Sequence, residues 1–552
     1  PQISVEILHP VGRLERMIRA VTMIPGATEF GYEPSPVTRN AGFGSYAPEN
    51  RHVTSAPSDW SASLDELQAV CPNLESVALV IAWFGSDLRA GECLIRPGVD
   101  RADKQTTGAV WAVAGRTRNT AYVVSATEGR GNFGGTPSDA SVIHAIRDLH
   151  ARGLKVTLYP FVMMDIPPGN ALPDPWTGAA AQPAFPWRGR ITCDPAPGQG
   201  GSPDGTALAA DQIATLFGTA TPAQFSLIGE NVLYAGPAEW TFRRMVLHYA
   251  KLCQAAGGVD AFLIGSECEA LTRVRSAAGV YPAVTQLVSL AEDVKAMLPA
   301  AKISYAANWT EYGAHVVDAG ASEVRFPLDP LWASAAIDFI GVDYYAPLAD
   351  WRDGSEHLDS ALAETIYEPD YLRSGLRRGE AYDFFYADDA ARRAQTRLPI
   401  SDGLGKPWLF RAKDLWNWWN EPHYERVDGV ELAEPTAWQP RSKAFRLTET
   451  GCPAVDKGAN QPNVFPDPKS AAAGLPYFSN GRRDDLVQRR YLEAVIAQFD
   501  PAFGASIEDN PVSAVYDGSM LDVSGIHVWT WDARPYPVFP LALDVWSDGP
   551  NC

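Results

Sequence analysis

The chain has 552 residues, of which 46% are hydrophobic and 20% charged, a composition typical of folded proteins rather than disordered ones. Its formal net charge of −20 disfavours binding to nucleic acid or to anionic membranes, because both need clustered Lys and Arg. No stretch approaches the roughly 18 apolar residues needed to cross a bilayer. The first residues carry neither an initiator Met nor a signal-peptide pattern, so we expect the chain to be part of a longer protein.

The seven cysteines are scattered, with no C-x-x-C pair and no Cys/His cluster at zinc spacing. We therefore expect free, buried thiols, and neither a metal site nor a cofactor. Cys268 and Cys452 each lie close to a glutamate that is discussed below, and a nucleophilic role has to be considered for both. Neither has a His nearby in sequence, which favours a packing role.

In chain order, residues 1–55 combine a short amphipathic stretch with Pro, Gly and Asn clusters, and we predict an N-terminal arm or linker there. Residues 56–545 alternate between strand and helix patterns, and residues 546–552 form a predicted tail. Apolar residues at helical spacing predict helices at 63–76, 137–153, 239–257, 281–299 and 484–499. Apolar runs predict strands at 76–85, 120–127 (the weakest), 155–165, 261–267, 302–309, 337–347, 444–451 and 525–532.

Continuous apolar runs are typical of strands buried on both faces of a parallel sheet. Eight such strands alternating with helices predict an α/β fold, a closed (β/α)8 TIM barrel, with long loop excursions at about 166–240 and 348–440. An open, doubly wound sheet is the alternative. It would require a Gly-rich phosphate loop after an early strand, and the one candidate, GRGNFGG, lacks the acidic residue that should follow.

Two of the predicted strands carry a glutamate at or near their end, Glu267 in AFLIGSE and Glu449 in AFRLTET. Burying an unpaired charge is costly, so a carboxylate at the end of an apolar strand points to a function. Active sites of TIM barrels lie at the carboxyl ends of the strands, and two facing carboxylates are the groups that cleave a glycosidic bond. The structural alternative is that each glutamate pairs with a nearby Arg, such as Arg273 or Arg446. Glu269 competes with Glu267 but lies past the expected strand end.

Aromatic side chains near the strand ends suit the apolar faces of sugar rings, and the chain has 17 Trp. A Tyr at the end of the 337–347 strand is placed to hydrogen-bond a catalytic carboxylate. We expect the Trp-rich loop KDLWNWWNEPHYERVDG to form a lid or a wall of the substrate site, because excursions after barrel strands lie on the active face. Asp165, Asp343 and Asp532 are weaker candidates for contacting hydroxyl groups, without metal-ligand spacing. The predicted substrate-binding residues are Trp83, Asp165, Ser266, Asn308, Trp309, Tyr344, Tyr345, Trp416, Trp418, Trp419, Trp529 and Trp531.

Several long motifs carry a family resemblance. IGSE, DYYAP, LTETGCPAVDKGANQPNVFPDPKS and HVWTWDARPYPVFP occur in order, as do PFVMMDIPPGNALPDPWTG and PAFPWRGRITCDPAPG. From about Leu64 to Phe539 the chain resembles the glycoside-hydrolase, TIM-barrel-like domain of gene transfer agent and phage-tail baseplate proteins.

The resemblance implies a barrel like those of glycoside hydrolase clan A, with Glu267 as acid/base and Glu449 as nucleophile. Ser266 stands where most clan A enzymes have an Asn that contacts the sugar 2-hydroxyl, so the resemblance does not define the sugar. It also implies a protein made in the bacterial cytoplasm and released in a phage-tail-like particle. Its expected partners are an oligo- or polysaccharide of the bacterial cell envelope and, through the flanking regions, other tail or baseplate proteins.

These patterns lead to the hypothesis of a retaining glycoside hydrolase that acts on an envelope or capsular glycan. The alternative is a non-catalytic, glycan-binding or structural barrel in the tail tip, because one fold serves many purposes. A metal-dependent hydrolase is a third hypothesis, for which the sequence offers no ligand cluster.

Overall fold

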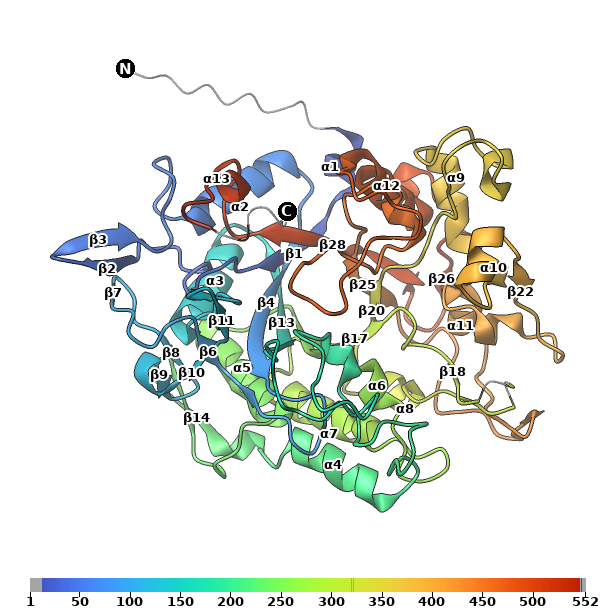
Figure 1. The fold of residues 1–552 in the computed structure, drawn as a ribbon, viewed down its shortest axis with the longest axis horizontal. Helices are drawn as coiled ribbons and strands as arrows, with labels where there is room; N and C mark the ends of the chain where they lie inside the picture. Colours follow the sequence, from blue (N-terminus) through green and yellow to red (C-terminus); the bar gives the residue numbers. More distant parts are fainter. Residues whose placement is uncertain (1–11, 319, 321, 547, 549–552) are drawn as a thin grey trace.

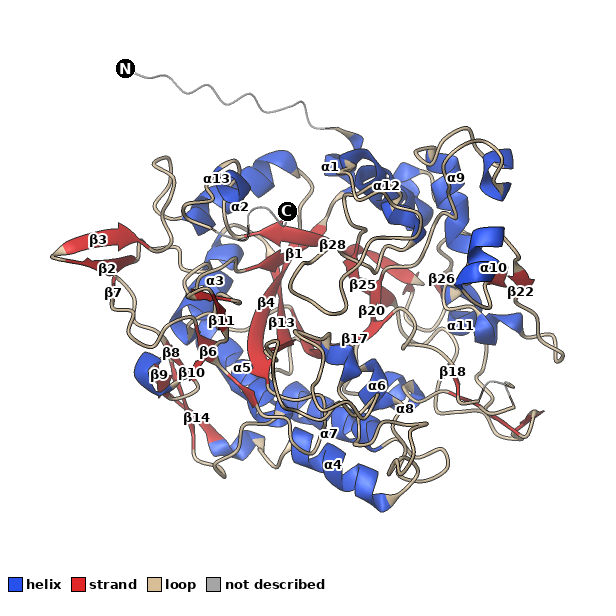
Figure 2. Cartoon of the chain, viewed as in Figure 1, coloured by secondary structure: helices blue, strands red, loops and turns tan. Residues whose placement is uncertain are grey.

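The computed structural model describes residues 12–318, 320, 322–546 and 548. Its centre is a sheet of eight parallel strands that closes on itself (Figures 1 and 2). The barrel strands are β1 (Ala20–Ile24), β4 (Ser76–Gly85), β13 (Lys155–Met164), β16 (Ala261–Ser266), β17 (Lys302–Asn308), β20 (Ile340–Tyr344), β25 (Phe445–Thr450) and β28 (Leu521–Asp532).

Closure depends on β1, which pairs in parallel with both β28 and β4. The remaining barrel strands pair in parallel with their neighbours in chain order, from β4 through β13, β16, β17, β20 and β25 to β28. The predicted (β/α)8 TIM barrel is therefore confirmed.

The observed barrel strands correct two predictions. β1 lies inside residues 1–55, which the sequence suggests are an arm, and its five residues AVTMI are almost entirely buried between two partner strands. The predicted strand at 120–127 was wrong, because that segment contributes only the short pairs β10 (Tyr122–Val123) and β11 (Ala126–Thr127) outside the barrel. The missed strand β1 and the wrongly predicted strand at 120–127 compensate for each other in the strand count. Glu267 therefore still follows the fourth barrel strand. Residues 1–11 of the predicted arm lie outside the described residues.

Helices cover the outer face of the barrel, as Figure 2 shows in blue. Side-chain caps begin several of them: Ser58 and Ser138 accept from the backbone N–H groups of Ser61 and Ser141, and Asp484 accepts from that of Val487. The helices are α1 (Arg13–Met17), α2 (Asp59–Val70), α3 (Asp139–Ala151), α4 (Ala207–Phe217), α5 (Phe242–Ala256), α6 (Glu269–Thr272), α7 (Pro282–Met297), α8 (Asp329–Ala333), α9 (Pro369–Ser374), α10 (Asp389–Ala394), α11 (Leu415–Asn420), α12 (Asp485–Phe499) and α13 (Val538–Leu541).

The barrel interior and the layer between strands and helices form separate apolar cores. The interior core is small and includes Tyr159 and Phe161 of β13, with Trp529 of β28 packed against it. The outer core is much larger and joins the strands to the helices and to the excursions. Strand residues therefore alternate between the two cores, and the inward-facing ones lead up to the carboxyl rim.

The two excursions carry small sheets and short helices outside the barrel. The first contains the 3-10 turn η2 (Arg188–Arg190), α4 and a hairpin, and the second contains α9, α10 and α11.

The remaining strands are β2 (Thr38–Gly42), β3 (Ser45–Pro48), β5 (Ile95–Arg96), β6 (Gly98–Val99), β7 (Thr106–Thr107), β8 (Ala112–Val113), β9 (Arg116–Thr117), β12 (Arg130–Gly131), β14 (Phe225–Ile228), β15 (Asn231–Tyr234), β18 (His315–Val316), β19 (Val324–Arg325), β21 (Phe384–Phe385), β22 (Leu398–Pro399), β23 (Arg426–Val427), β24 (Val430–Glu431), β26 (Val512–Ser513) and β27 (Gly518–Ser519).

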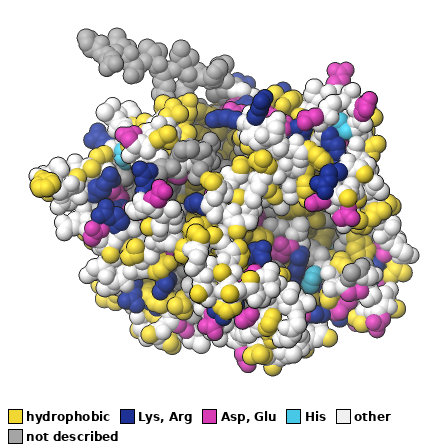
Figure 3. All heavy atoms as spheres, in the orientation of Figure 1, with side chains coloured by type: hydrophobic (Ala, Val, Ile, Leu, Met, Phe, Trp, Pro, Cys, Tyr) yellow, Lys and Arg dark blue, Asp and Glu magenta, His cyan; other side chains and the backbone are white. Residues whose placement is uncertain are grey.

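The surface view in Figure 3 shows acidic, basic and apolar side chains interspersed over one face. In the described part of the chain, no helix combines the length and the apolar character required to span a bilayer. Most of the predicted tail lies outside the described residues, but Trp546 is buried and packs edge-on against His52 and Phe539.

Candidate active site

Glu267 directly follows β16 and is held at the carboxyl rim by three side chains. Its Oε2 atom accepts hydrogen bonds from Trp187 Nε1 at 3.0 Å and from Arg188 at 2.8 Å, and its Oε1 accepts from Asn308 Nδ2 at 2.9 Å. The backbone of Glu267 adopts a φ of +49°, which is uncommon for a residue with a Cβ. Backbone strain of this kind is found preferentially at functional sites.

Glu449 lies near the end of β25 and faces the same rim. Tyr345 donates its hydroxyl to Oε2 of Glu449 at 2.7 Å, and Oε1 has no hydrogen-bond partner within the described ranges. Burial, followed by the nearby charges of Asp343 and Glu267, raises the pKa of Glu449 well above its usual value. One oxygen of this carboxyl therefore lacks a hydrogen-bond donor, and the group retains a proton more readily than an ordinary glutamate.

Asp343 is a third buried carboxyl, directly opposite Glu449 in the pairing of β20 with β25. It accepts hydrogen bonds from the Tyr159 hydroxyl at 2.8 Å, from Thr448 Oγ1 at 2.7 Å and from Ser266 Oγ at 3.2 Å. Burial, and then the charge of Glu267, raises the pKa of Asp343 to about 7. It points into the barrel, where it contacts Tyr159 of the interior core and, through Ser266, the end of β16.

Arg188, at the start of η2 in the first excursion, is the positive charge of this cluster. Its Nε donates to the carbonyl oxygen of Ser266 at 3.1 Å, and its guanidinium also contacts Ser266 Oγ and Glu267. The Arg188 side chain is 9% exposed and that of Glu267 10% exposed, so the pair remains in contact with solvent only at its edge. Nearby carboxylates, Glu267 foremost, outweigh the desolvation of Arg188 and raise its pKa.

Aromatic rings line the floor beside Arg188. The Arg188 guanidinium carbon lies 4.2 Å from the centre of the Phe161 ring, and Trp529 lies parallel to Phe161 with ring centres 6.0 Å apart. Trp529 is only partly buried, so its ring is placed to contact a ligand at the rim.

Three loops meet above the rim and explain why the carboxylates are nearly covered. Phe133 packs edge-on against Phe185, and Phe465 packs against Tyr345. Lys469 Nζ donates to the Asn132 carbonyl oxygen at 3.0 Å. The loops before α3, after β13 and after β25 therefore contact one another over the mouth of the barrel.

Five of the predicted site residues come together in this cluster: Glu267, Glu449, Ser266, Asn308 and Tyr345. Trp529 joins them through Phe161 and Arg188. The two arginines named as structural partners pair elsewhere, Arg273 with Glu269 and Arg446 with Asp522. Glu267 nevertheless pairs with an arginine, Arg188 of the first excursion.

Three other predicted residues lie away from the cluster. Trp83 faces outward, where its Nε1 donates to the Tyr249 hydroxyl of α5 at 2.8 Å. Asp165 is buried and anchors a neighbouring loop, since it accepts from the Tyr122 hydroxyl and from the backbone and side chain of Ser125. Tyr344 is fully buried between its inward-facing neighbours in β20, and its hydroxyl has no partner among the residues described.

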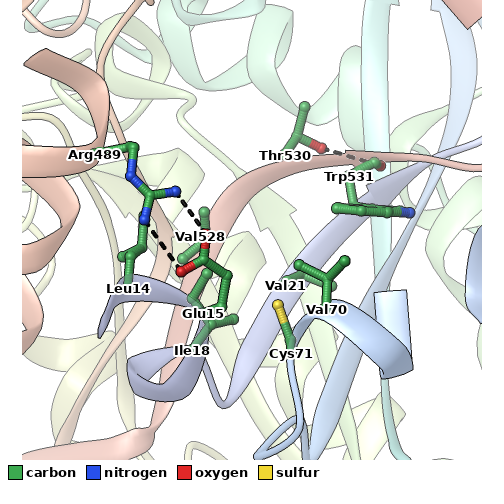
Figure 4. A pocket seen from close by; sticks show the side chains of 10 residues that line it. All are labelled: Leu14, Glu15, Ile18, Val21, Val70, Cys71, Arg489, Val528, Thr530 and Trp531. Atoms are coloured by element: carbon green, nitrogen blue, oxygen red, sulfur yellow. Dashed lines mark hydrogen bonds and ion pairs between the residues drawn. The ribbon is translucent and has the colours of Figure 1, made fainter. Parts of the chain in front are cut away.

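Trp531 also faces away from the barrel interior. Its Nε1 donates to Ser63 Oγ at 2.8 Å, and its ring lines an outer crevice of about 180 Å3 (Figure 4). Cys71 and the ion pair of Glu15 with Arg489 line the same crevice. These residues belong to the packing of α1, α2 and α12 on the strands.

The Trp-rich loop is part of a buried core instead of an exposed wall. Trp416 Nε1 donates to the Asp509 carbonyl oxygen, and Trp419 Nε1 donates to that of Lys443. Trp418 is also buried, and together with Trp309 it lines a side pocket that is described below. The sequence pattern did not distinguish a lid from the core of an excursion, because both are rich in aromatic residues.

Sequence reasoning missed the two residues of the first excursion that contact Glu267, Trp187 and Arg188. The available signal was the run WRGR inside a Pro-rich loop, where an Arg beside a Trp has no nearby acidic residue. Cys268 and Cys452 are buried, and burial raises the pKa of the Cys268 thiol to about 12, which disfavours the nucleophilic thiolate. No group of three or more His, Cys, Asp and Glu residues in the described ranges is placed to hold a metal ion.

The family model of the GTA TIM-barrel-like domain matches residues 240–540, more than half of the chain. The protein belongs to this family. No curated protein matches the chain.

Among solved structures, the chain is similar to the GH113 β-mannanase from Alicyclobacillus acidocaldarius in complex with ManMIm, at 15% identity and a TM-score of 0.39, covering 97% of this chain and 92% of that one. It is also similar to a GH113 β-1,4-mannanase at 13% identity and a TM-score of 0.38, covering 94% and 90%. The fold of this GTA-family barrel is established by its own strand pairing.

Proposed function

We propose that the protein is a retaining glycoside hydrolase with Glu267 and Glu449 as its catalytic pair. The observation that carries the proposal is that both carboxyls lie at one rim of a closed barrel around Asp343, which is opposite Glu449 in the strand pairing and accepts from Ser266, the residue before Glu267. Two carboxyls at one site are what cleavage of a glycosidic bond requires, one as proton donor and one as nucleophile.

The reaction assigns one role to each carboxyl. Glu267 donates its proton to the leaving oxygen, while Oε1 of Glu449 attacks the anomeric carbon and forms a glycosyl–enzyme ester. Glu267 then removes a proton from water, the water oxygen bonds to the anomeric carbon, and the ester bond to Glu449 breaks. The free Oε1 of Glu449 and the Tyr345 hydroxyl on Oε2 support the nucleophile assignment.

In the free protein the raised pKa of Glu449 favours its protonated form, whereas a nucleophile has to be ionised. Catalysis therefore requires Glu449 to release its proton when substrate binds. A positively charged, oxocarbenium-like transition state beside Glu449 favours that release.

The proposed substrate is a glycan of the bacterial cell envelope or capsule, and the proposed setting is the baseplate of a phage-tail-like particle. The match to the GTA TIM-barrel-like domain family supports this setting. Other tail proteins are the proposed partners. The protein would be made in the bacterial cytoplasm and released with the particle.

The test combines a panel of chromogenic glycosides and purified envelope glycans with Glu267→Gln and Glu449→Gln. We expect turnover in the wild type and a loss of at least a thousandfold in both variants, with Glu434→Gln, an exposed glutamate, as the matched control. A 2-deoxy-2-fluoro glycoside should label Glu449, and proton NMR of the products should show retention. Labelling of Glu267 would reverse the two roles, and inversion would exclude the covalent step.

A non-catalytic, glycan-binding barrel is the second candidate. It is favoured by the contacts that restrain Glu267, because both carboxylate oxygens already accept hydrogen bonds from protein groups. Binding of a glycan without turnover by the wild type and by both variants would support this candidate.

A further inference from the structure

A side pocket of about 120 Å3 lies between the loop after β17 and the segment that leads into α11. Thr310 connects this pocket to the candidate active site, because it lines the pocket and its backbone N–H donates at 3.0 Å to Oδ1 of Asn308, the residue whose amide holds Glu267.

Three buried N–H groups on the pocket-lining side chains lack an acceptor. They are Nε1 of Trp309, Nε1 of Trp418 and Nε of Arg411, and none has a hydrogen-bond partner within the described part of the chain. A buried donor without a partner destabilises a fold, and native structures contain few of them. Three such donors on one small pocket indicate a site that is completed by a hydrogen-bond acceptor.

The charge around the pocket favours a neutral acceptor over an anion. Arg411 brings one positive charge, but its guanidinium lies 3.6 Å from the fully buried carboxylate of Asp414 and over the ring of Tyr382. The positive charge of Arg411 is therefore already balanced by Asp414, although its Nε–H group has no acceptor among the described residues. The chain as a whole also has a net charge of −20, which disfavours an anionic ligand.

The size and the walls of the pocket restrict the acceptor further. At about 30 Å3 for each water molecule, 120 Å3 corresponds to about four heavy atoms, fewer than a sugar ring contains. Trp408, Leu409 and Phe410 give the pocket apolar walls. An acetamido group has four heavy atoms, a carbonyl acceptor and a methyl group that suits such walls.

We propose that this pocket binds the N-acyl group of an amino sugar, so that N-acylated amino sugars are the substrate class. The carbonyl oxygen accepts from two of the N–H groups of Trp309, Trp418 and Arg411, and the methyl packs on the aromatic walls. The link between the pocket and hydrolysis rests on the proposed function, whereas binding of the acyl group does not.

The loop after β17 offers a conservative way to block the pocket. A Cβ on Gly313 would lie 3.5 Å from Cδ1 and 3.6 Å from Nε1 of Trp418, which is ordinary contact, and the backbone there suits any residue. Gly313→Ala should therefore fold normally while its methyl group covers the Trp418 N–H. Trp309→Phe removes a second donor and retains an aromatic ring.

The experiment measures binding to the full chain carrying Glu267→Gln and Glu449→Gln, so that turnover has no influence on the result. The ligands are matched pairs, N-acetylglucosamine with glucosamine and glucose, and the corresponding galactose and mannose series. We expect at least one N-acetyl sugar to bind at least tenfold more tightly than its partners. Gly313→Ala and Trp309→Phe should each abolish most of that preference, and Ile228→Ala, an exposed residue of β14, should leave it unchanged.

Equal binding within every matched pair would overturn the proposal, as would a preference that both pocket variants retain. An N-acetyl preference without turnover in the wild type would preserve the pocket assignment and reject the hydrolase. Turnover of glycans that lack N-acyl groups, with no N-acetyl preference in binding, would support the hydrolase and reject the pocket assignment.

Discussion

Arg188 and Glu267 form an ion pair of 2.8 Å that joins the first excursion to the end of β16. The same guanidinium donates to the carbonyl oxygen of Ser266, so one side chain restrains both the backbone and the carboxylate at this strand end. The reach of this arginine explains how a Glu at a strained φ of +49° keeps one orientation.

Removing only the arginine should be strongly destabilising, because it leaves a nearly buried carboxylate without its counter-charge. We expect Arg188→Met to lower the free energy of unfolding by about 3–5 kcal/mol, measured by urea denaturation. Adding Glu267→Gln to this variant should recover much of the loss, since the stranded charge is then absent. A loss below about 1 kcal/mol in the single variant would show that the pair contributes little.

The hydrogen bond from Tyr345 to Glu449 should matter for activity. The bond lowers the pKa of Glu449 against the larger effect of burial, so Tyr345→Phe should raise that pKa further and reduce the ionised fraction. We expect kcat to fall by about ten- to a hundredfold, the equivalent of one hydrogen bond to a charged group. Tyr344→Phe is the matched control, because the Tyr344 hydroxyl faces away from the rim and has no partner among the residues described. Equal effects of the two variants would contradict the assignment.

The regular part of the barrel was predictable because its strands are long apolar runs between well-capped helices. β1 was not, because five residues between Pro, Gly and Asn clusters show no periodicity of their own, and only pairing with both β4 and β28 makes them a strand. The opposite error at 120–127 has the same origin, since the run AYVV is apolar but pairs only locally.

At the site, the strand-end residues Glu267, Asn308, Tyr345 and Glu449 were predictable from their positions alone. The aromatic residues were not, because a Trp near a strand end can face the barrel, as Trp529 does, or a helix, as Trp83 does. Arg188 lies 79 positions from Glu267 in a loop without periodicity, so only tertiary structure reveals the contact.

Asp343 should make stability depend on pH. Its pKa is raised to about 7 in the folded protein, against about 3.9 in an unfolded chain. Between these values the native state keeps a proton that the unfolded state releases, so the free energy of unfolding should fall as pH rises from about 4 to about 7. The raised pKa of Glu449, and that of Glu311 at about 8, act in the same direction.

Urea denaturation at a series of pH values should therefore show a shallower fall for Asp343→Asn than for the wild type. The readout is the slope, because the substitution also changes the hydrogen bonds with Tyr159 and Thr448. Asp211→Asn, at an exposed position of α4, should leave the slope unchanged. An identical slope in Asp343→Asn would show that this carboxyl is ionised throughout the range.

Gly189 should control the position of the Trp187 ring over Glu267. A Cβ at residue 189 would lie 2.3–2.5 Å from three atoms of that ring, far inside contact distance, so Gly189→Ala must displace the indole. Trp187 is only partly buried and belongs to a loop, so we expect the ring to move outward while the barrel remains folded. Displacement breaks the 3.0 Å hydrogen bond from Nε1 to Glu267 and removes part of the cover over the rim.

Trp187→Phe also removes this donor but keeps most of the ring, so it separates the loss of the hydrogen bond from the loss of cover. We expect kcat to fall by about tenfold in Trp187→Phe and further in Gly189→Ala, with little change in the free energy of unfolding of either. If Gly189→Ala were as active as the wild type, the contact between the first excursion and Glu267 would have no part in catalysis.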